Sequence, residues 1–123
     1  MKLTLSRAAL AAAAVAFVVI VLGAYVRLSH AGLGCPDWPG CYGDLTWPVV
    51  SHEIEQANQA FPERPVETAK AWKEMVHRYL AGILVLLVVF INYLAWKPGS
   101  GSRQSRPVAG FLLVLILFQA ALG

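Results

Sequence analysis

The sequence predicts an all-α, integral membrane helical bundle, and composition and hydropathy patterning point to this class. Of the 123 residues, 58% are hydrophobic and only 14% are charged, whereas about a quarter of the residues of a soluble domain are charged. The apolar residues are gathered into three long runs, each free of charged side chains. This composition argues against a soluble globular domain and against disorder, and it predicts a membrane protein with a few spans.

The first run, residues 8–26, is long enough to cross a bilayer. As a helix it would rise roughly 28 Å, close to the thickness of the hydrocarbon layer. Lys2 and Arg7 precede it, a pattern that a secretory signal peptide also shows. The run is longer than the usual apolar region of a signal peptide, which favours a retained span over a cleaved segment.

The second run covers residues 79–96, and we expect its helix to begin before the membrane, near Thr68. Residues 68–78 contain neither Gly nor Pro, while Pro98 and Gly99 end the pattern. The third run, 108–123, would rise only roughly 24 Å, and the chain stops inside it. We therefore expect three of the four helices of a half-bundle, in a chain that is a fragment.

Charge sets the expected orientation. The N-terminal tail and the connection 97–107 carry basic residues and no acid, whereas all seven acidic residues lie in the connection 27–78. The positive-inside rule then places the N-terminus in the cytoplasm and 27–78 outside as the outer loop. The basic residues form no dense run, so the expected partner is the lipid bilayer and not nucleic acid.

The outer loop holds both cysteines, Cys35 and Cys41, in a compartment that permits disulfides. Pro36, Pro39 and Gly40 are turn formers around them. Two interpretations stay open at this point. A disulfide here would staple the loop at the membrane surface, contributing about 2 kcal/mol by the chain-entropy estimate, or the pair would be redox-active and take electrons from a nearby reaction.

Glu74 and His77 lie three residues apart, on one face of the predicted helix, at the outer end of the second run. Neutral imidazole can ligate haem iron, and a carboxylate one turn away can exchange protons. The alternative is an interfacial pair solvated by lipid headgroups. Arg27 and Arg78 are basic residues on the side of the membrane that the positive-inside rule expects to be poor in them. They would either extend to lipid phosphates or pair with carboxylates such as haem propionates.

Other polar residues carry weaker expectations. His30 is expected to be a solvated loop histidine. His52 lies with Glu53 and Glu55 in a polar stretch, 51–63, that we expect to be a loop, and neighbouring residues on a loop are weak evidence for a metal site. Gln119 is expected to make a hydrogen bond between helices, and the alanines of 8–16 would let a neighbouring helix approach closely.

Four segments together resemble the haem A synthase family and cover nearly the whole chain. They are GAYVRLS (23–29), GLGCPDWPGCYG (32–43), WKEMVHRYLAG (72–82) and FQAALG (118–123). The resemblance implies an enzyme of eight spans in two similar four-helix bundles. Such enzymes oxidise a methyl group of haem O to the formyl group of haem A, which terminal oxidases use as a cofactor.

The resemblance also implies roles for individual residues. His77 would be a haem ligand in the half that takes haem O, and Glu74 the carboxylate that assists oxidation of the methyl group. Cys35 and Cys41 would form the outer-loop disulfide, with a role in accepting electrons. A haem b would be held by the other half of the protein for electron transfer.

The chain departs from the family pattern because it ends before the fourth helix, where a partner histidine is expected, and lacks the C-terminal half. We expect the fragment alone to be inactive. The expected setting is the bacterial inner membrane, with haem O, the missing half, haem O synthase, a terminal oxidase or a second copy as partners. Alternatives are a non-enzymatic, disulfide-stapled membrane module and a b-type haem electron carrier.

Overall fold

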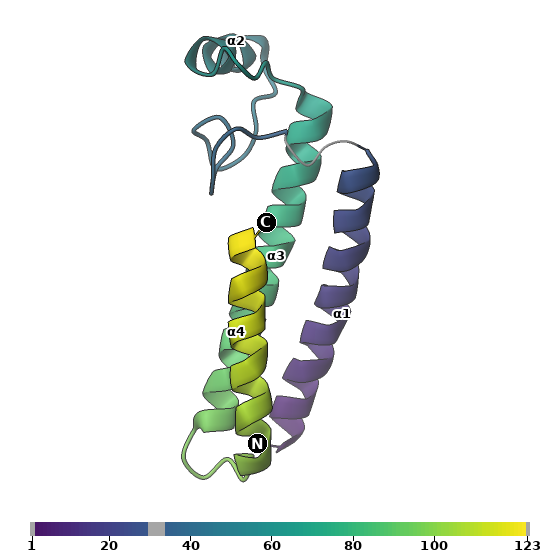
Figure 1. The fold of residues 1–123 in the computed structure, drawn as a ribbon, viewed down its shortest axis with the longest axis vertical. Helices are drawn as coiled ribbons and strands as arrows, with labels where there is room; N and C mark the ends of the chain where they lie inside the picture. Colours follow the sequence, from purple (N-terminus) through teal and green to yellow (C-terminus); the bar gives the residue numbers. More distant parts are fainter. Residues whose placement is uncertain (1, 30–33, 123) are drawn as a thin grey trace. The chain divides into compact units, whose positions relative to one another are not determined.

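The computed structural model describes residues 2–29 and 34–122. The secondary-structure elements in these ranges are all helices (Figure 1). The elements are α1 (Lys2–Leu28), α2 (Ser51–Ala60), α3 (Thr68–Trp96), the short 3-10 turn η1 (Arg103–Ser105) and α4 (Arg106–Leu122). One isolated antiparallel bridge pairs Cys41 with Asp44. The predicted all-α class is confirmed.

Three helices are long and apolar enough to cross a membrane: Leu3–Leu28, Thr68–Trp96 and Arg103–Leu122. The chain is therefore that of a multi-pass membrane protein. Each apolar run found in the sequence falls on one of these helices, although the last residue of the third run lies outside the described residues. Each helix also extends beyond the apolar run on its N-terminal side, because helix formation does not require an apolar side chain at every position.

α3 begins at Thr68 and continues without interruption to Trp96, as the sequence predicted. Pro98, which cannot continue a helix, and Gly99, which has φ +77°, follow its last residue. The turn that follows is held to the helix end by Arg106, whose Nε donates to the carbonyl of Ala95 at 3.1 Å. The Arg106 guanidinium also lies 5.4 Å from the centre of the Trp96 ring.

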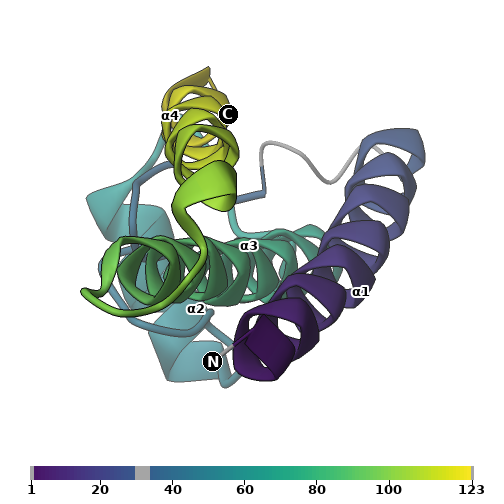
Figure 2. The same cartoon turned by 90° about the horizontal axis from the view of Figure 1, so that it is seen from below.

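The chain divides into two compact units, and we describe each by itself. The first consists of Met1–Val18 with Leu80–Gly123. Within it, α4 runs antiparallel beside the second part of α3, as Figures 1 and 2 both show. Its apolar core is formed by Ala8, Ala12, Leu84, Val88, Ile91, Leu94, Ala95 and Ala109. The expectation that small residues of α1 permit close packing is met by Ala8 and Ala12, one turn apart in this core.

A polar contact joins α3 to α4 within this unit. The amide nitrogen of Asn92 donates to the carbonyl of Ala109 at 2.9 Å and to that of Val88 at 3.0 Å. We expected such a bond from Gln119, but that residue is exposed and Asn92 makes the bond instead. A carbonyl oxygen has two lone pairs, so the oxygen of Ala109 can accept this bond in addition to its helical one.

The second unit, Val19–Tyr79, contains the end of α1, the connection that includes α2, and the first turns of α3. Its buried apolar cluster consists of Cys35, Cys41, Tyr42, Ala57, Ala71 and Met75. The expectation of a loop over 51–63 is wrong for Ser51–Ala60, which is α2. The missed signal is Glu53, whose carboxylate accepts the N–H groups of Val49 (3.2 Å) and Val50 (3.3 Å) at the start of the helix.

These two backbone hydrogen bonds lower the pKa of Glu53 below its ordinary value. Glu53 is thus a helix-start residue. Across residues 2–29 and 34–122, no group of three or more His, Cys, Asp or Glu side chains is arranged to hold a metal ion.

The Asn92 bond can be tested by replacement with Leu, which has nearly the same size. We expect Asn92→Leu to weaken α3–α4 packing by about 1 kcal/mol, in the range measured for hydrogen bonds between membrane helices. Unfolding in mixed detergent micelles would measure the change. Tyr93→Phe is the control, because Tyr93 is exposed; an Asn92→Leu protein as stable as this control would show that the bond contributes nothing.

Candidate functional site

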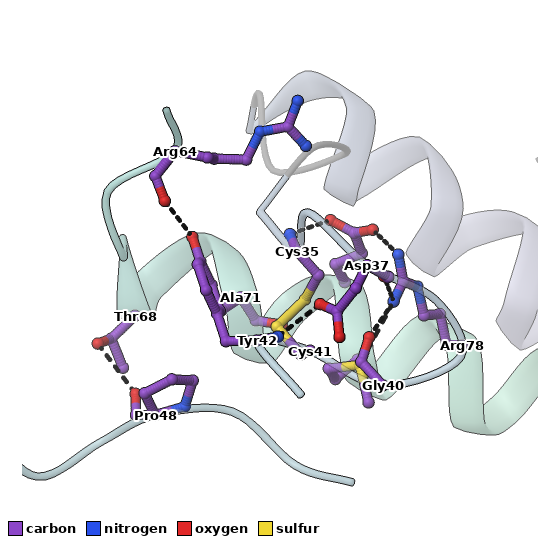
Figure 3. Close-up of a disulfide and its surroundings, with 12 residues drawn as sticks. Cys35, Asp37, Gly40, Cys41, Tyr42, Pro48, Arg64, Thr68, Ala71 and Arg78 are labelled. Atoms are coloured by element: carbon purple, nitrogen blue, oxygen red, sulfur yellow. Dashed lines mark hydrogen bonds and ion pairs between the residues drawn. A yellow bond between two sulfur atoms is a disulfide. The ribbon is translucent and has the colours of Figure 1, made fainter. Parts of the chain in front are cut away.

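The centre of the second unit is a disulfide loop. Cys35 and Cys41 are joined by a disulfide, as Figure 3 shows. Just beyond it the Asp37 carboxylate accepts the backbone N–H groups of Tyr42 at 2.5 Å and Gly43 at 2.8 Å. Tyr42 has φ +52°, a left-handed conformation that non-glycine residues rarely adopt. The carboxylate thus stabilises a turn in which Tyr42 would otherwise be disfavoured.

The disulfide is buried. Cys35 is 4% exposed and Cys41 is 0% exposed, and both belong to the apolar cluster of this unit. The Cys35 sulfur lies 3.8 Å from the carbonyl oxygen of Ala71 on α3, a packing contact, since a disulfide sulfur carries no proton to donate. Because thiol–disulfide exchange requires access to a sulfur atom, this burial favours the structural interpretation of the pair.

Glu74 connects this loop to α3. Its side chain is buried, with the whole residue 8% exposed. One carboxylate oxygen accepts the backbone N–H of Cys35 at 3.0 Å, and the other accepts from Nη2 of Arg78 at 2.5 Å. Each oxygen of the buried carboxylate therefore has a donor, which offsets the cost of removing a charge from water.

Arg78 has a second set of contacts inside the disulfide loop. Its Nη1 donates to the carbonyl of Asp37 at 2.8 Å and to that of Gly40 at 2.7 Å (Figure 3). A guanidinium has five N–H groups in a planar fork, so one on Nη2 and the one on Nε are left after these bonds. The predicted pairing of Arg78 with propionates stays a prediction, and the structure adds a role that the sequence did not reveal.

His77 follows on the same helix but meets a different neighbour. The residue is half-buried. A Cβ added at Gly23 of α1 would lie 3.0 Å from Nε2 of the imidazole and 3.5 Å from Cδ2. The ring thus lies close to α1 at a glycine, where a larger side chain would crowd its Nε2. Within the described residues neither ring nitrogen has a hydrogen-bond partner in the protein.

The remaining predicted residues are more peripheral. Arg27 is exposed in the last turn of α1. His30 lies outside the described residues. A contact that sequence reasoning missed joins α1 to α3 here, because Nζ of Lys73 lies 5.0 Å from the centre of the Tyr25 ring and 6.0 Å from that of Trp72. Cation–π contacts form between residues that can be far apart in the sequence, so no local sequence pattern predicts them.

Tyr42 ties the disulfide loop to the segment that precedes α3. Its hydroxyl lies 3.1 Å from the carbonyl oxygen of Arg64 and 3.3 Å from that of Pro65, and its ring packs edge-on against Phe61. Burial raises the pKa of the Tyr42 hydroxyl above its ordinary value, an effect that the positive charge of Arg64 partly opposes. The neutral hydroxyl is the form that donates to these carbonyls.

Comparison with known proteins assigns the chain to a family. Residues 6–123 match the COX15-CtaA family, described as cytochrome oxidase assembly protein. The chain belongs to this family. No solved structure gives a significant match.

Individual relatives agree with this assignment. The chain is 51% identical over 105 residues to a protein named haem A synthase from Shewanella oneidensis, covering 85% of this chain and 31% of that protein. It is 30% identical over 106 residues to a haem A synthase from Exiguobacterium sibiricum and 28% identical over 109 residues to one from Halalkalibacterium halodurans. These matches cover 86% of this chain in both cases, and 28% and 30% of the relatives. The chain thus spans about a third of the length of these curated relatives.

Gly34 offers a test of how tightly the disulfide loop is seated on α3. A Cβ there would lie 2.6 Å from the backbone carbon of Lys70 and 2.8 Å from the nitrogen of Ala71. Because helix backbone cannot yield as a side chain can, we expect Gly34→Ala to destabilise the loop by about 1–3 kcal/mol, the usual cost of overpacking. The measurement is the rate at which Cys35–Cys41 becomes reducible in dithiothreitol, followed by maleimide labelling.

Gly82→Ala is the matched control, because a Cβ at that helical glycine meets nothing within 4 Å. If Gly34→Ala protected the disulfide as well as Gly82→Ala does, the close approach between the loop and α3 would not exist in the protein.

Proposed function

We propose that the chain is the N-terminal part of a haem A synthase, and that the complete protein oxidises a methyl group of haem O to the formyl group of haem A. The 51% identity to the Shewanella oneidensis haem A synthase carries this proposal. The arrangement of Glu74, His77 and the disulfide loop around the first turns of α3 supports it. The product would serve as a cofactor of terminal oxidases.

The residues present fit a haem. His77 is half-buried, its ring nitrogens have no hydrogen-bond partner among the described residues, and Gly23 adds no side chain beside its Nε2. An imidazole with a free nitrogen is a common axial ligand of haem iron. We propose that His77 would hold the iron of haem O in this half, and that a haem b is held by the remainder of the protein.

Bound haem supplies the redox-active iron porphyrin on which the methyl group is carried. Converting a methyl to a formyl group adds one oxygen atom, taken from water, and releases four electrons and four protons. Glu74 would receive protons or stabilise positive charge near the methyl group. A carboxylate has about four lone-pair sites, so Glu74 retains capacity to accept a proton while it is held by Cys35 and Arg78.

The two outer arginines would pair with the propionates of the substrate. Arg27 is exposed at the end of α1, and its guanidinium is available for a bidentate contact. Arg78 would contribute through Nε and the remaining N–H of Nη2. Its other N–H groups hold the disulfide loop.

The membrane setting belongs to the same proposal. The apolar runs support spans near 8–26, 79–96 and 108–123, and the charge distribution supports an N-terminus in the cytoplasm with the segment 27–78 outside. The likeness to bacterial haem A synthases supports the bacterial inner membrane as the location. Haem O synthase would supply the substrate and a terminal oxidase would receive the product. A second copy of the protein is a further partner that this arrangement permits.

The role of Glu74 can be tested by Glu74→Gln in the complete protein. We expect the ratio of haem A to haem O to fall by about 10²–10⁴-fold, the usual contribution of a positioned acid–base group. Haems extracted from membranes and separated by chromatography give this ratio. Glu67→Gln is the control, since that carboxylate is exposed in a salt bridge with Lys70.

An unchanged ratio in Glu74→Gln would show that Glu74 does not act in the reaction. The same extraction separates the alternatives for the whole protein. A non-enzymatic module would carry no haem, and a b-type electron carrier would carry haem without altering the haem composition of the membrane.

The role of His77 and Gly23 can be tested by haem binding. We expect Gly23→Val to weaken haem binding at this site at least about tenfold, because its side chain would occupy the space at Nε2 of His77. Haem titration of the complete protein, followed in the Soret band, measures this, with Gly82→Ala as control. Wild-type binding by His77→Ala would show that His77 is not the ligand.

A further inference from the structure

Glu74 and the disulfide loop are joined by more than one path. The direct path is the hydrogen bond from the Cys35 N–H to the Glu74 carboxylate. The second path runs through Arg78, which binds Glu74 with Nη2 and the loop with Nη1. The two loop acceptors, the carbonyls of Asp37 and Gly40, both lie between the cysteines that the disulfide connects.

This arrangement depends on the loop being closed. The disulfide fixes the two ends of the loop, and the carbonyls of Asp37 and Gly40 then converge on a single nitrogen of Arg78. An open loop would have many more conformations, and few of them would direct both carbonyls to one point. The loop is also seated against α3 at Gly34, where only a glycine leaves room for the helix backbone.

We propose that Arg78 is a positioning residue that couples the disulfide loop to the Glu74 carboxylate, so that the closed loop fixes where the carboxylate lies. The inference rests on the proposed function only in giving Glu74 a reaction to assist. The coupling itself is a property of the protein without haem. It assigns the disulfide a part in building the site that does not require it to accept electrons.

The fork of a guanidinium explains why this position is an arginine. Nη1 and Nη2 donate in different directions, to the loop and to Glu74 respectively. A lysine ammonium is a point donor on a flexible stem and does not hold two separate sets of acceptors in fixed directions. Arg78→Lys therefore keeps the charge beside Glu74 but not the rigid link.

Coupling between two sites is reciprocal, so it can be measured from the loop. If the closed loop stabilises the Glu74–Arg78 pair, the pair stabilises the closed loop by the same free energy. Removing the pair should then make the disulfide easier to reduce. Dithiothreitol provides the two electrons and two protons, becoming a cyclic disulfide as Cys35 and Cys41 become thiols.

The experiment equilibrates the complete protein, without added haem, in buffers of reduced and oxidised dithiothreitol, approached from both directions. The fraction of thiol is read by a maleimide mass tag. We expect Arg78→Gln and Glu74→Gln each to raise the equilibrium constant for reduction about tenfold, equivalent to about 30 mV for a two-electron couple. The double variant should change by more than either single variant but by less than the hundredfold product, because the two residues share the Glu74–Arg78 bond while each also contacts the loop by itself.

Lys70→Gln is the matched control, since Lys70 is a cation on the same helix whose Nζ pairs with Glu67 and not with the loop; it should leave the equilibrium unchanged. Arg78→Lys should shift the equilibrium at least about threefold. If Arg78→Gln does not fold, the result for Arg78→Lys alone tests the coupling. An unshifted equilibrium in Arg78→Lys and Arg78→Gln, or single effects that multiply in the double variant, would overturn the coupling.

This readout separates the inference from the proposed function. A shifted disulfide equilibrium with normal haem A formation in Glu74→Gln would keep the coupling and reject the role of Glu74 in the reaction. An unshifted equilibrium with lost haem A formation would do the reverse.

Discussion

The largely buried ion pair of Glu74 and Arg78 is the interaction on which the second unit of this protein depends. Glu74, with a side chain that is 11% exposed on a helix of membrane-spanning length, must be paired and hydrogen-bonded, because an unpaired buried charge is very costly. Arg78 and the Cys35 N–H meet this need. The loop backbone is stabilised as well, because Arg78 donates hydrogen bonds to two of its carbonyl groups. Helix and loop therefore satisfy each other's polar groups.

The fold and the site differ in how far the sequence predicts them. Apolar runs and helix-ending residues are local signals, so the three long helices and the start of α3 near Thr68 followed from composition and spacing. The contacts of Arg78 join residues 38 and 41 positions apart, and no local pattern encodes such pairs. α2 was missed because its polar composition suggested a loop, although Glu53 carried the helix-start signal.

For Glu74 and His77, the sequence predicted a shared helix face but not the residues that each side chain contacts. Their spacing of three residues places them about 60° apart around a helix, so they share a broad face. The structure gives the two side chains different neighbours, the disulfide loop for Glu74 and Gly23 of α1 for His77. Sequence spacing thus identified the pair, whereas the elements that position each member became evident only from the packing of the second unit.

Burial of the disulfide changes how its part in the proposed reaction is best understood. Forming a formyl group from a methyl group releases four electrons, and a disulfide accepts two, so one disulfide could not complete the conversion without being reoxidised midway. The sulfur atoms lie in an apolar cluster, where a partner would need access for each exchange. Under the proposed coupling, a disulfide that closes the loop around Arg78 would instead contribute continuously, by keeping the carboxylate of Glu74 in one place throughout the proposed reaction.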